Sequence, residues 1–457
     1  MRPVFWILSA AAAAIILGVF LGSSAPSLEA GPMVGAVTDR DARVWLRTVG
    51  EKRLNAYLWP GPGLFAVRSF QIQTQSQEDF TAHLIFDDLV PDRRYRYLIC
   101  EGLRPLAAGT FATDGPRRSQ KPLTFIFGSC FKPIYRIEKG EALFEQMAAK
   151  KADLVFFLGD FPYAKGESAP GIRQRHLELR RIPGFSDLTA STPTLAIWSD
   201  HDYGMSDGDG TYPNKAEALG VFKEYWANAS YGTDEEPGVF GRYRYGPADF
   251  FLLDERYQAL KTKDNPRILG ENQWRWLMDG LTASDAPFKV IVSDVPLTRD
   301  NPDAWGGNHF LPERERLLDF NSQKRISGVF MISGDIHRVD VHRVPLKDGR
   351  FFYDFTSSPM SNVYKSPPPN DQRPPEMIYA HGETHAYCTI ELWPQARGDE
   401  SALCFRVFSG VAGEVHEEVL RAVDLGMGSN VGASNVGISN VGASNVGASN
   451  VGTVPTT

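Results

Sequence analysis

Four apolar segments of this chain end in residues that can bind metals or move protons. The segments FIFGSC (125–130), LVFFLGDFPY (154–163), TLAIWSDHDYG (194–204) and GVFMISGDIHR (328–338) end in cysteine, or in aspartate with tyrosine or histidine. Short β-branched and aromatic runs that stop at such residues are typical of buried strands whose ends carry ligands. The four segments therefore predict one site at the edge of a sheet.

Asp160 and Tyr163 supply oxygen ligands at the end of the second segment. Asp160 follows an apolar run and Gly159, so its carboxylate should project into the crevice where α/β sheets hold ligands. A carboxylate there can bridge two cations, and a tyrosine phenolate suits a hard trivalent ion such as Fe(III). The alternatives are that Asp160 caps the following loop and that Tyr163 only packs.

The other three segments add sulfur, nitrogen and further oxygen ligands. Asp200 is a second carboxylate, and the adjacent His201 could hold a substrate oxygen or protonate a leaving group without binding metal. Asp335 and His337 stand two apart, which on a strand puts both on one face. Cys130 is either a ligand or a small buried apolar residue.

Together these residues predict a hydrolytic site with two metal ions. Two cations about 3.5–4 Å apart would lower the pKa of a bound water from about 15.7 towards 7 and hold both oxygens of an in-line displacement. The sequence contains no G-x-S-x-G elbow and no P-loop, which removes the commonest esterase and nucleotidase routes. Seven other histidines are expected to be core or surface residues: His83, His176, His309, His342, His381, His385 and His416.

The composition indicates a globular protein of two or three domains. Of its 457 residues, 42% are hydrophobic and 12% aromatic, which is ample for apolar cores. The formal net charge of -7, with no basic stripe, argues against a nucleic-acid or anionic membrane surface. An anionic substrate would therefore need local positive charge, which metal ions supply most economically.

Residues 1–30 are predicted to be a signal peptide or an N-terminal anchor. Met1-Arg2-Pro3 precedes an apolar stretch from Val4 to Leu21 and then small residues, which is the order of a secretory signal. The stretch is long for a signal peptide, so an uncleaved membrane anchor is the alternative. Either way we expect an extracytoplasmic location, in the periplasm, at the cell surface or secreted.

Residues 31–113 are predicted to form an all-β domain. Runs such as ARVWLRT and YRYLICEG are separated by Gly, Pro and Asp turns. The stretch DDLVPDRRYRYLI resembles the fibronectin type III pattern, in which a Leu-x-Pro turn leads into a strand whose tyrosine hydroxyl closes a tyrosine corner. Leu89, Pro91 and Tyr95 or Tyr97 would take those parts, and an unrelated β-hairpin is the alternative.

After a charged, proline-bearing linker at 114–122, strand-like and helical runs alternate through 123–425, which predicts an α/β domain with a mixed sheet and helices on its faces. The runs RFFYDFTSS, HAYCTIELW and ALCFRVFSG are expected to be antiparallel, because little lies between some of them to form a crossover helix. Helices are expected near 138–150, 170–181, 214–229, 271–282 and 312–322.

Two further features concern the cysteines and the C-terminus. Cys388 and Cys404 lie in neighbouring strand-like runs and could form a disulfide in an oxidising compartment. Residues 426–457 repeat Ser-Asn-Val-Gly and cannot bury enough apolar surface to order themselves, so a disordered tail is predicted. A short stack of β-coils is the alternative.

The set of motifs resembles the alkaline phosphatase D, or PhoD-like, metallophosphatases. The motifs follow the family order and the resemblance covers roughly residues 31–421, since the family often carries a β-domain ahead of the phosphatase domain. They are FGSC (127–130), LGDFPY (158–163), IWSDHD (197–202), LLDERY (252–257), LGENQWRWLMDGL (269–281), the stretch containing PERERLLDF (304–320), and SGDIHR (333–338).

The resemblance implies two metal-binding sets that share one carboxylate. A ferric ion would be held by Cys130, Asp160, Tyr163 and His337, and calcium by Asp160, Asp200 and Asp335. His201 would stabilise or protonate the leaving oxygen. The implied activity is hydrolysis of phosphomonoesters and phosphodiesters at alkaline pH outside the cytoplasm. Manganese or zinc could occupy the same ligands instead.

The chain also departs from the family pattern. Ser199 stands where the family often has Asp, Asp202 where it often has Glu, and Phe131 where Gln commonly follows the cysteine. No twin-arginine pair precedes the apolar N-terminal stretch, although metal-loaded members are often exported folded. The alternatives in function are a dedicated phosphodiesterase or phospholipase acting on small or polymeric esters, and a surface-binding protein whose phosphatase domain is degenerate.

Overall fold

The computed structural model describes residues 27–427 except for 64–65, 133–136, 165, 167, 263–265, 298–303, 308, 383, 396–400 and 411. The predicted signal or anchor and the repeats from Gly428 onward therefore lie outside the described residues. Within the described part, no helix is both long and apolar enough to cross a membrane. Gly426 N donates to Val423 O and Met427 packs against the core, so the compact unit extends two residues into the predicted tail.

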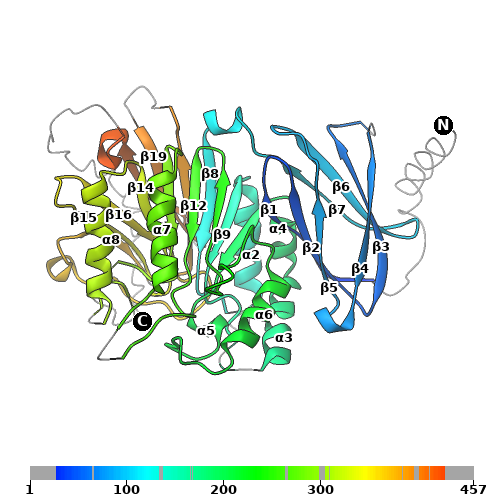
Figure 1. Cartoon of the computed structure of the whole chain (residues 1–457), viewed down its shortest axis with the longest axis horizontal. Helices are drawn as coiled ribbons and strands as arrows, with labels where there is room; N and C mark the ends of the chain where they lie inside the picture. Colours follow the sequence, from blue (N-terminus) through cyan, green and yellow to red (C-terminus); the bar gives the residue numbers. More distant parts are fainter. Residues whose placement is uncertain are drawn as a thin grey trace, which may run out of the picture. The chain divides into compact units, whose positions relative to one another are not determined.

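The N-terminal strands form two sheets, as the sequence predicts for an all-β segment (Figure 1). The buried Leu89 precedes a turn in which Val90 N donates to Tyr95 Oη at 2.9 Å, the contact expected of a tyrosine corner. The assignment to the fibronectin type III fold stays a prediction. In sheet order the strands are β1 (Leu28–Val37), β2 (Ala42–Thr48) and β5 (Thr81–Phe86), then β4 (Arg68–Thr74), β3 (Lys52–Pro60), β6 (Arg94–Glu101) and β7 (Arg104–Ala112).

The α/β part contains two mixed sheets rather than one. The six-stranded sheet has the order β10 (Thr194–Ile197), β9 (Leu154–Leu158), β8 (Leu123–Gly128), β18 (Ala386–Leu392), β19 (Ser401–Ser409) and β20 (Gly413–Arg421). The seven-stranded sheet has the order β11 (Gly241–Tyr245), β12 (Ala248–Leu252), β13 (Phe288–Val292), β14 (Val329–Ser333), β16 (Phe351–Thr356), β15 (Val339–Pro345) and β17 (Met377–His381).

Aromatic side chains fill the space between these two sheets. The ring centroids of Phe156 and Phe250 lie 4.6 Å apart, and those of Phe355 and Phe405 lie 4.8 Å apart. Because side chains alternate along a strand, Phe250 joins this inner core while Phe251 points the other way, into a second core. One face of β12 therefore packs in the core between the two sheets, and the other face packs in the second core.

Helices cover the outer faces of both sheets (Figure 1). α7 (Glu271–Ala283) and α8 (Leu311–Lys324) pack on the seven-stranded sheet through the second core. On the side of the six-stranded sheet lie α2 (Ile137–Ala149), α3 (Ala169–Arg180), α4 (Pro183–Thr189) and α6 (Lys215–Tyr225). All five helices predicted from sequence are confirmed, whereas α4 and the four-residue α5 (Asp200–Tyr203) were not expected.

Two sequence predictions about the C-terminal strands need correction. β18 and β19 are antiparallel to each other and β16 is antiparallel to β15, as predicted, but β16 also runs parallel to β14 because it inserts between β14 and β15. Cys388 and Cys404 are both free. Cys404 pairs in register with Glu391, three positions from Cys388, so the two thiols lie on opposite faces of the sheet and do not form the disulfide.

A buried arginine joins the N-terminal sheets to the α/β part. The guanidinium of Arg180 lies 4.7 Å from the ring centroid of Trp45 and 4.6 Å from that of Trp226. The Arg180 side chain is almost wholly buried and donates hydrogen bonds to the backbone oxygens of His176 and Tyr225. Trp45 Nε1 in turn donates to Glu224 O at 2.8 Å. Cation–π contacts thus hold Arg180 at this interface, and an ion pair between the neighbouring Arg181 and Glu29 of β1 also joins the two parts.

Candidate metal centre

The ends of four strands meet where the sequence predicts a site. β8, β9 and β10 are neighbours in the six-stranded sheet, and β14 belongs to the other sheet. The two sheets touch at this edge, since Asp335 N donates to Ser129 Oγ at 3.2 Å. Gly334 permits this approach, because a Cβ there would lie 2.6 Å from the same oxygen. The residues that follow these strands are therefore brought to one place.

Most of the predicted ligands have an unusual backbone conformation. Cys130, Asp160, Tyr163, Asp335 and His337 have φ angles of 58°, 54°, 65°, 66° and 60°. Few non-glycine residues adopt this left-handed region, and such residues cluster at functional sites. Asp335 and His337 therefore do not share one face of a strand, as their spacing predicted. They lie in the loop that follows β14 because the strand ends at Ser333.

A first group of ligand atoms comes from Cys130, Asp160 and His337, whose candidate donor atoms all lie within 4.8 Å of one another. Cys130 Sγ is 3.5 Å from Asp160 Oδ2. Tyr163 Oη lies 3.3 Å from His337 Nε2. The four residues that the family resemblance assigns to one metal are therefore neighbours in space.

A second group consists of Asp160, Asp200 and His201, again with donor atoms within 4.8 Å. His201 Nδ1 lies 2.8 Å from Asp200 Oδ1 and 3.4 Å from Asp160 Oδ1. His201 thus lies close enough to both carboxylates to share a metal with them. The sequence instead predicted that it lies next to the metal ligands without binding metal itself. Asp335 is not in this group, although its carboxylate is close enough for the charges of Asp200 and Asp160 to act on its pKa.

The electrostatics of these residues fit a bound cation. Burial raises the pKa of Asp335 to about 8, and the charges of Asp200 and Asp160 add to this effect. Burial also raises the pKa of the Cys130 thiol and of the Tyr163 phenol, again with help from neighbouring negative groups. Each shift reflects negative charge crowded into a buried space, which a cation would relieve. Sulfur, imidazole and phenol donors with carboxylates suit a transition metal beside a hard oxygen-binding ion.

His201 has opposing influences on its protonation. Burial lowers the pKa of its imidazole, but hydrogen bonds to Asp160 and Asp200 outweigh burial and raise the pKa to about 10. The pKa of Asp200 is lowered despite burial, through the hydrogen bond from His201 and the charge of Arg256. The two shifts have the same physical cause, the contact between His201 Nδ1 and Asp200 Oδ1 at 2.8 Å.

Arg256 is a site residue that sequence reasoning missed. It is buried, and its Nε donates to Asp294 Oδ2 at 2.7 Å while Nη2 donates to Ser199 Oγ at 3.2 Å. Ser199 Oγ lies 3.3 Å from Asp200 Oδ1, so the arginine supports this ligand through one serine. The signal was present in the LLDERY motif, where an arginine follows two acidic residues at the end of an apolar strand.

Asn362 and Asp202 are two further residues whose positions were not predicted. Asn362 Nδ2 donates to Tyr163 Oη and lies 3.4 Å from His337 Nε2. The Asp202 carboxylate accepts hydrogen bonds from the backbone N–H groups of Phe161 and Ser199 and so links two ligand-bearing loops. Nothing in the sequence around Asn362 distinguishes it from an ordinary loop residue.

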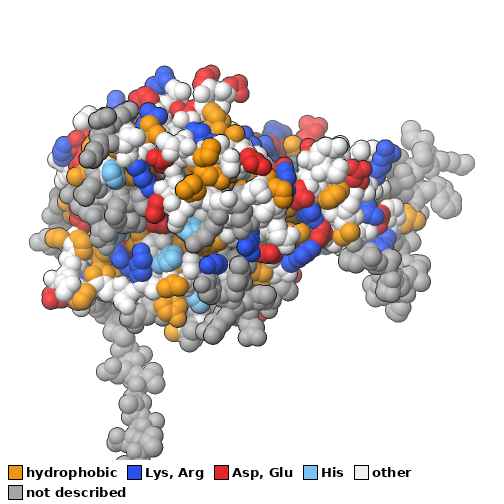
Figure 2. All heavy atoms as spheres, turned by 90° about the horizontal axis from the view of Figure 1, so that it is seen from below, with side chains coloured by type: hydrophobic (Ala, Val, Ile, Leu, Met, Phe, Trp, Pro, Cys, Tyr) orange, Lys and Arg blue, Asp and Glu red, His pale blue; other side chains and the backbone are white. Residues whose placement is uncertain are grey.

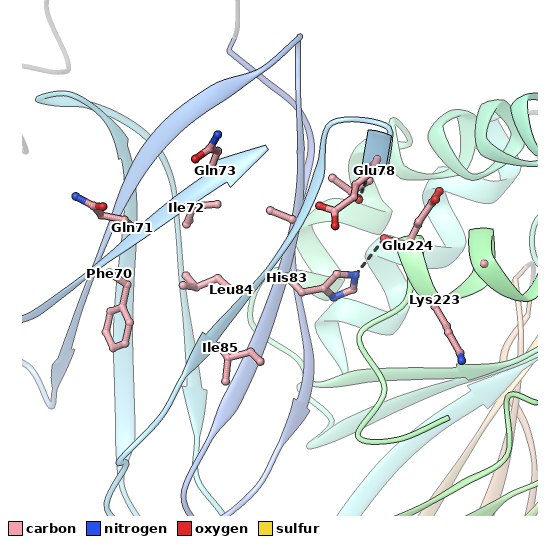
Figure 3. Close-up of a pocket in the computed structure, with 13 residues that line it drawn as sticks. Phe70, Gln71, Ile72, Gln73, Glu78, His83, Leu84, Ile85, Lys223 and Glu224 are labelled. Atoms are coloured by element: carbon pink, nitrogen blue, oxygen red, sulfur yellow. Dashed lines mark hydrogen bonds between the residues drawn. The ribbon is translucent and has the colours of Figure 1, made fainter. Parts of the chain in front are cut away.

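A groove of about 590 Å³ lies elsewhere, between β4, β5 and α6 (Figure 3). His83 reaches across it, with Nε2 3.2 Å from Glu224 O. None of the predicted ligands lines this groove. It follows the seam between the N-terminal sheets and the α/β part and is separate from the candidate metal centre.

Comparison with known proteins identifies the family of this chain. The profile of the PhoD-like phosphatase family matches residues 125–392, which hold all the predicted ligands. Alkaline phosphatase D of Bacillus subtilis is 25% identical over 320 residues, which make up 56% of this chain and 53% of that protein. The chain thus spans about half the length of this relative.

Solved structures show the same fold. A structure of PhoD superposes with a TM-score of 0.73 at 17% identity, covering 87% of this chain and 90% of that one. The purple acid phosphatase PPD1 from yellow lupin seeds superposes with a TM-score of 0.62 at 11% identity, covering 88% and 77%. Sequence profile and fold agree, and the chain belongs to the PhoD-like phosphatase family.

Proposed function

We propose that this protein is a metal-dependent hydrolase of phosphoric esters. The observation that carries the proposal is the pair of ligand groups that share Asp160, one with Cys130 and His337 and the other with Asp200 and His201. Two cations bound there supply Lewis-acid chemistry, polarising a phosphoryl group and lowering the pKa of water. The family of the chain supports the same reaction class.

Other side chains of the site would transfer a proton and position the ligand loops. His201 Nδ1 is held by Asp200 at 2.8 Å, which leaves Nε2 to protonate the leaving oxygen. The His201 side chain is 15% exposed, so the ring is open to a substrate on one side. Arg256 and Asp202 hold the ligand loops in place from behind the site.

We further propose Fe(III) in the set of Cys130, Asp160, Tyr163 and His337, and Ca²⁺ in the set of Asp160, Asp200 and Asp335. The sulfur and phenol donors favour a transition metal in the first set, and the carboxylates favour a hard ion in the second. Manganese or zinc is the alternative occupant. Export is proposed on the leader-like sequence of residues 1–30 alone.

The test is an isosteric substitution of the shared carboxylate. In Asp160→Asn we expect the bound metal to fall in both sets and hydrolysis of p-nitrophenyl phosphate and of its bis-ester to drop by at least about 10³-fold. The control is Asp88→Asn, because Asp88 is exposed and has a similar φ of 47°. Asparagine tolerates this backbone region, so neither variant adds strain.

Relative rates on the monoester and the bis-ester also separate a general phosphatase from a dedicated phosphodiesterase. Metal content is measured by mass spectrometry on the same samples. Wild-type protein that binds iron and calcium but hydrolyses neither ester would favour the degenerate, surface-binding alternative. Full activity of Asp160→Asn would reject the shared-ligand site.

A further inference from the structure

The loop at 361–365 is fastened to the candidate metal centre at both ends. Ser361 N donates to Cys130 O at 3.1 Å, and Lys365 N donates to His337 O at 2.8 Å. Both acceptors belong to predicted metal ligands, one in the loop after β8 and the other in the loop after β14. The loop therefore has a fixed position relative to the centre.

Between these two anchors the loop presents apolar side chains to solvent. Val363 is 66% exposed and Tyr364 is 44% exposed, while their neighbour Asn362 turns inward to Tyr163. A single exposed apolar residue is ordinary on a protein surface. Val363 and Tyr364 are two such residues in succession, on a loop that is hydrogen-bonded to two predicted ligands. They therefore form an apolar surface beside the candidate metal centre.

A second loop, on the Asp200 side of the centre, also exposes an apolar side chain. Met205 is 54% exposed and is the second residue after α5, which carries Asp200 and His201. This loop is also held at the centre, because Gly204 N donates to Asp200 O at 2.8 Å and Asp207 N donates to Asp200 Oδ2 at 2.6 Å. From below, histidine side chains are seen next to hydrophobic and basic ones (Figure 2).

We propose that Met205, Val363 and Tyr364, here called the apolar rim, bind the organic group of the ester and determine specificity. The preferred substrates then carry a large aromatic or aliphatic group on the phosphate. Covering these side chains removes apolar surface from water, and the anchored loops lose little entropy when they do so. This inference rests on the proposed phosphate-ester chemistry and adds the class of ester.

Binding of two phosphonates tests the rim without requiring turnover. The full chain, loaded with iron and calcium, is titrated with methylphosphonate and with phenylphosphonate by calorimetry. We expect wild-type protein to bind phenylphosphonate roughly tenfold more tightly, and Val363→Ser/Tyr364→Ser to reduce this preference below about threefold. Methylphosphonate affinity should stay within about twofold, because the backbone anchors of the loop are kept.

Met205→Ser should lower the preference in the same way, and Phe351→Ser is the control. Phe351 is 36% exposed and lies on β16, away from the anchored loops, so its variant should retain the full preference. Equal affinity of wild type for both phosphonates, or a preference that survives in the double variant, would overturn the rim. Equal weakening of both phosphonates would show a structural role of the loop and also overturn it. If neither phosphonate binds, the proposed function fails, and the rim with it.

Discussion

At the scale of single residues, His201 has neighbours that suggest two roles. Its Nδ1 lies close to two carboxylates, as a ligand would, yet the hydrogen bond to Asp200 also suits an acid that protonates a leaving oxygen. We expect His201→Ala to lower kcat by about 10²–10⁴-fold while metal content stays near that of wild type. Loss of a metal from this variant would make His201 a ligand. His342→Ala, another histidine in the described chain, controls for general damage.

Tyr163 gives a spectroscopic test of the ferric assignment. Its Oη lies 3.3 Å from His337 Nε2, so an ion between them would contact both. If the ion is Fe(III), a tyrosinate-to-iron charge-transfer band should colour the protein and should vanish in Tyr163→Phe. A colourless wild-type enzyme that is active with another metal would reject iron and keep the rest of the proposal.

At the scale of the elements, the turn after β9 determines how close β9 and β10 come. Gly159 has φ of 85°, and a Cβ there would lie 2.5 Å from the backbone nitrogen of Ser199. Gly349 has almost the same φ, 87°, but nothing lies within 4 Å of an added Cβ. Substituting alanine at each of these two glycines therefore separates the cost of backbone strain from the cost of steric contact.

We expect Gly349→Ala to cost about 1–2 kcal/mol of unfolding free energy, as left-handed backbone alone predicts. Gly159→Ala should cost at least about 1 kcal/mol more and abolish hydrolysis, because Asp160 and Ser199 must move apart. Denaturant unfolding measures the stability of both variants, and assays with p-nitrophenyl phosphate and its bis-ester measure their activity. Equal costs in the two variants would show that the ligand loops are free to separate.

At the scale of the whole molecule, the cation–π interface should make the N-terminal sheets and the α/β part unfold together. Trp45 is fully buried against Arg180 and Tyr225. Trp45→Ala should therefore cost about 3–5 kcal/mol. Leu103→Ala, at a side chain that is 68% exposed, should change stability by less than about 0.5 kcal/mol. Two separate thermal transitions in wild type would contradict this coupling.

Buried acids make the stability of the metal-free protein depend on pH. Burial is the main cause that raises the pKa of Asp202 and Asp335 to about 8 and that of Asp354 to about 7. The folded chain then holds protons that the unfolded chain releases near pH 4, so stability falls as pH rises from about 4 to 8. The raised pKa of His201 continues this loss to about pH 10.

A metal ion would replace the proton on Asp335, a proposed ligand, so metal should stabilise the protein most at alkaline pH. We expect the difference in Tm between metal-loaded and chelated protein to be at least about 3 °C larger at pH 9 than at pH 6. Differential scanning calorimetry at both pH values measures it. A larger difference at pH 6 would mean that Asp335 is not a metal ligand.

Local patterns in the sequence determined the elements and their order. Apolar runs that stop at Asp160, Asp200 and Asp335 predicted the strand ends, and helical periodicity predicted α2, α3, α6, α7 and α8 within a few residues. The ordered motifs around them were enough to identify the family. These features depend on residues close together in the chain, and propensity and burial period act over that range.

Only the tertiary structure decided which atoms meet. Tyr163 and His337 are 174 positions apart, and they lie together because the two sheets pack face to face and the ends of their strands meet. The same packing brings His201 among the ligands, leaves Asp335 outside the second group and places Arg256 behind Ser199. Such contacts depend on the packing of distant strands and on left-handed turns, which a strand pattern of period two does not encode.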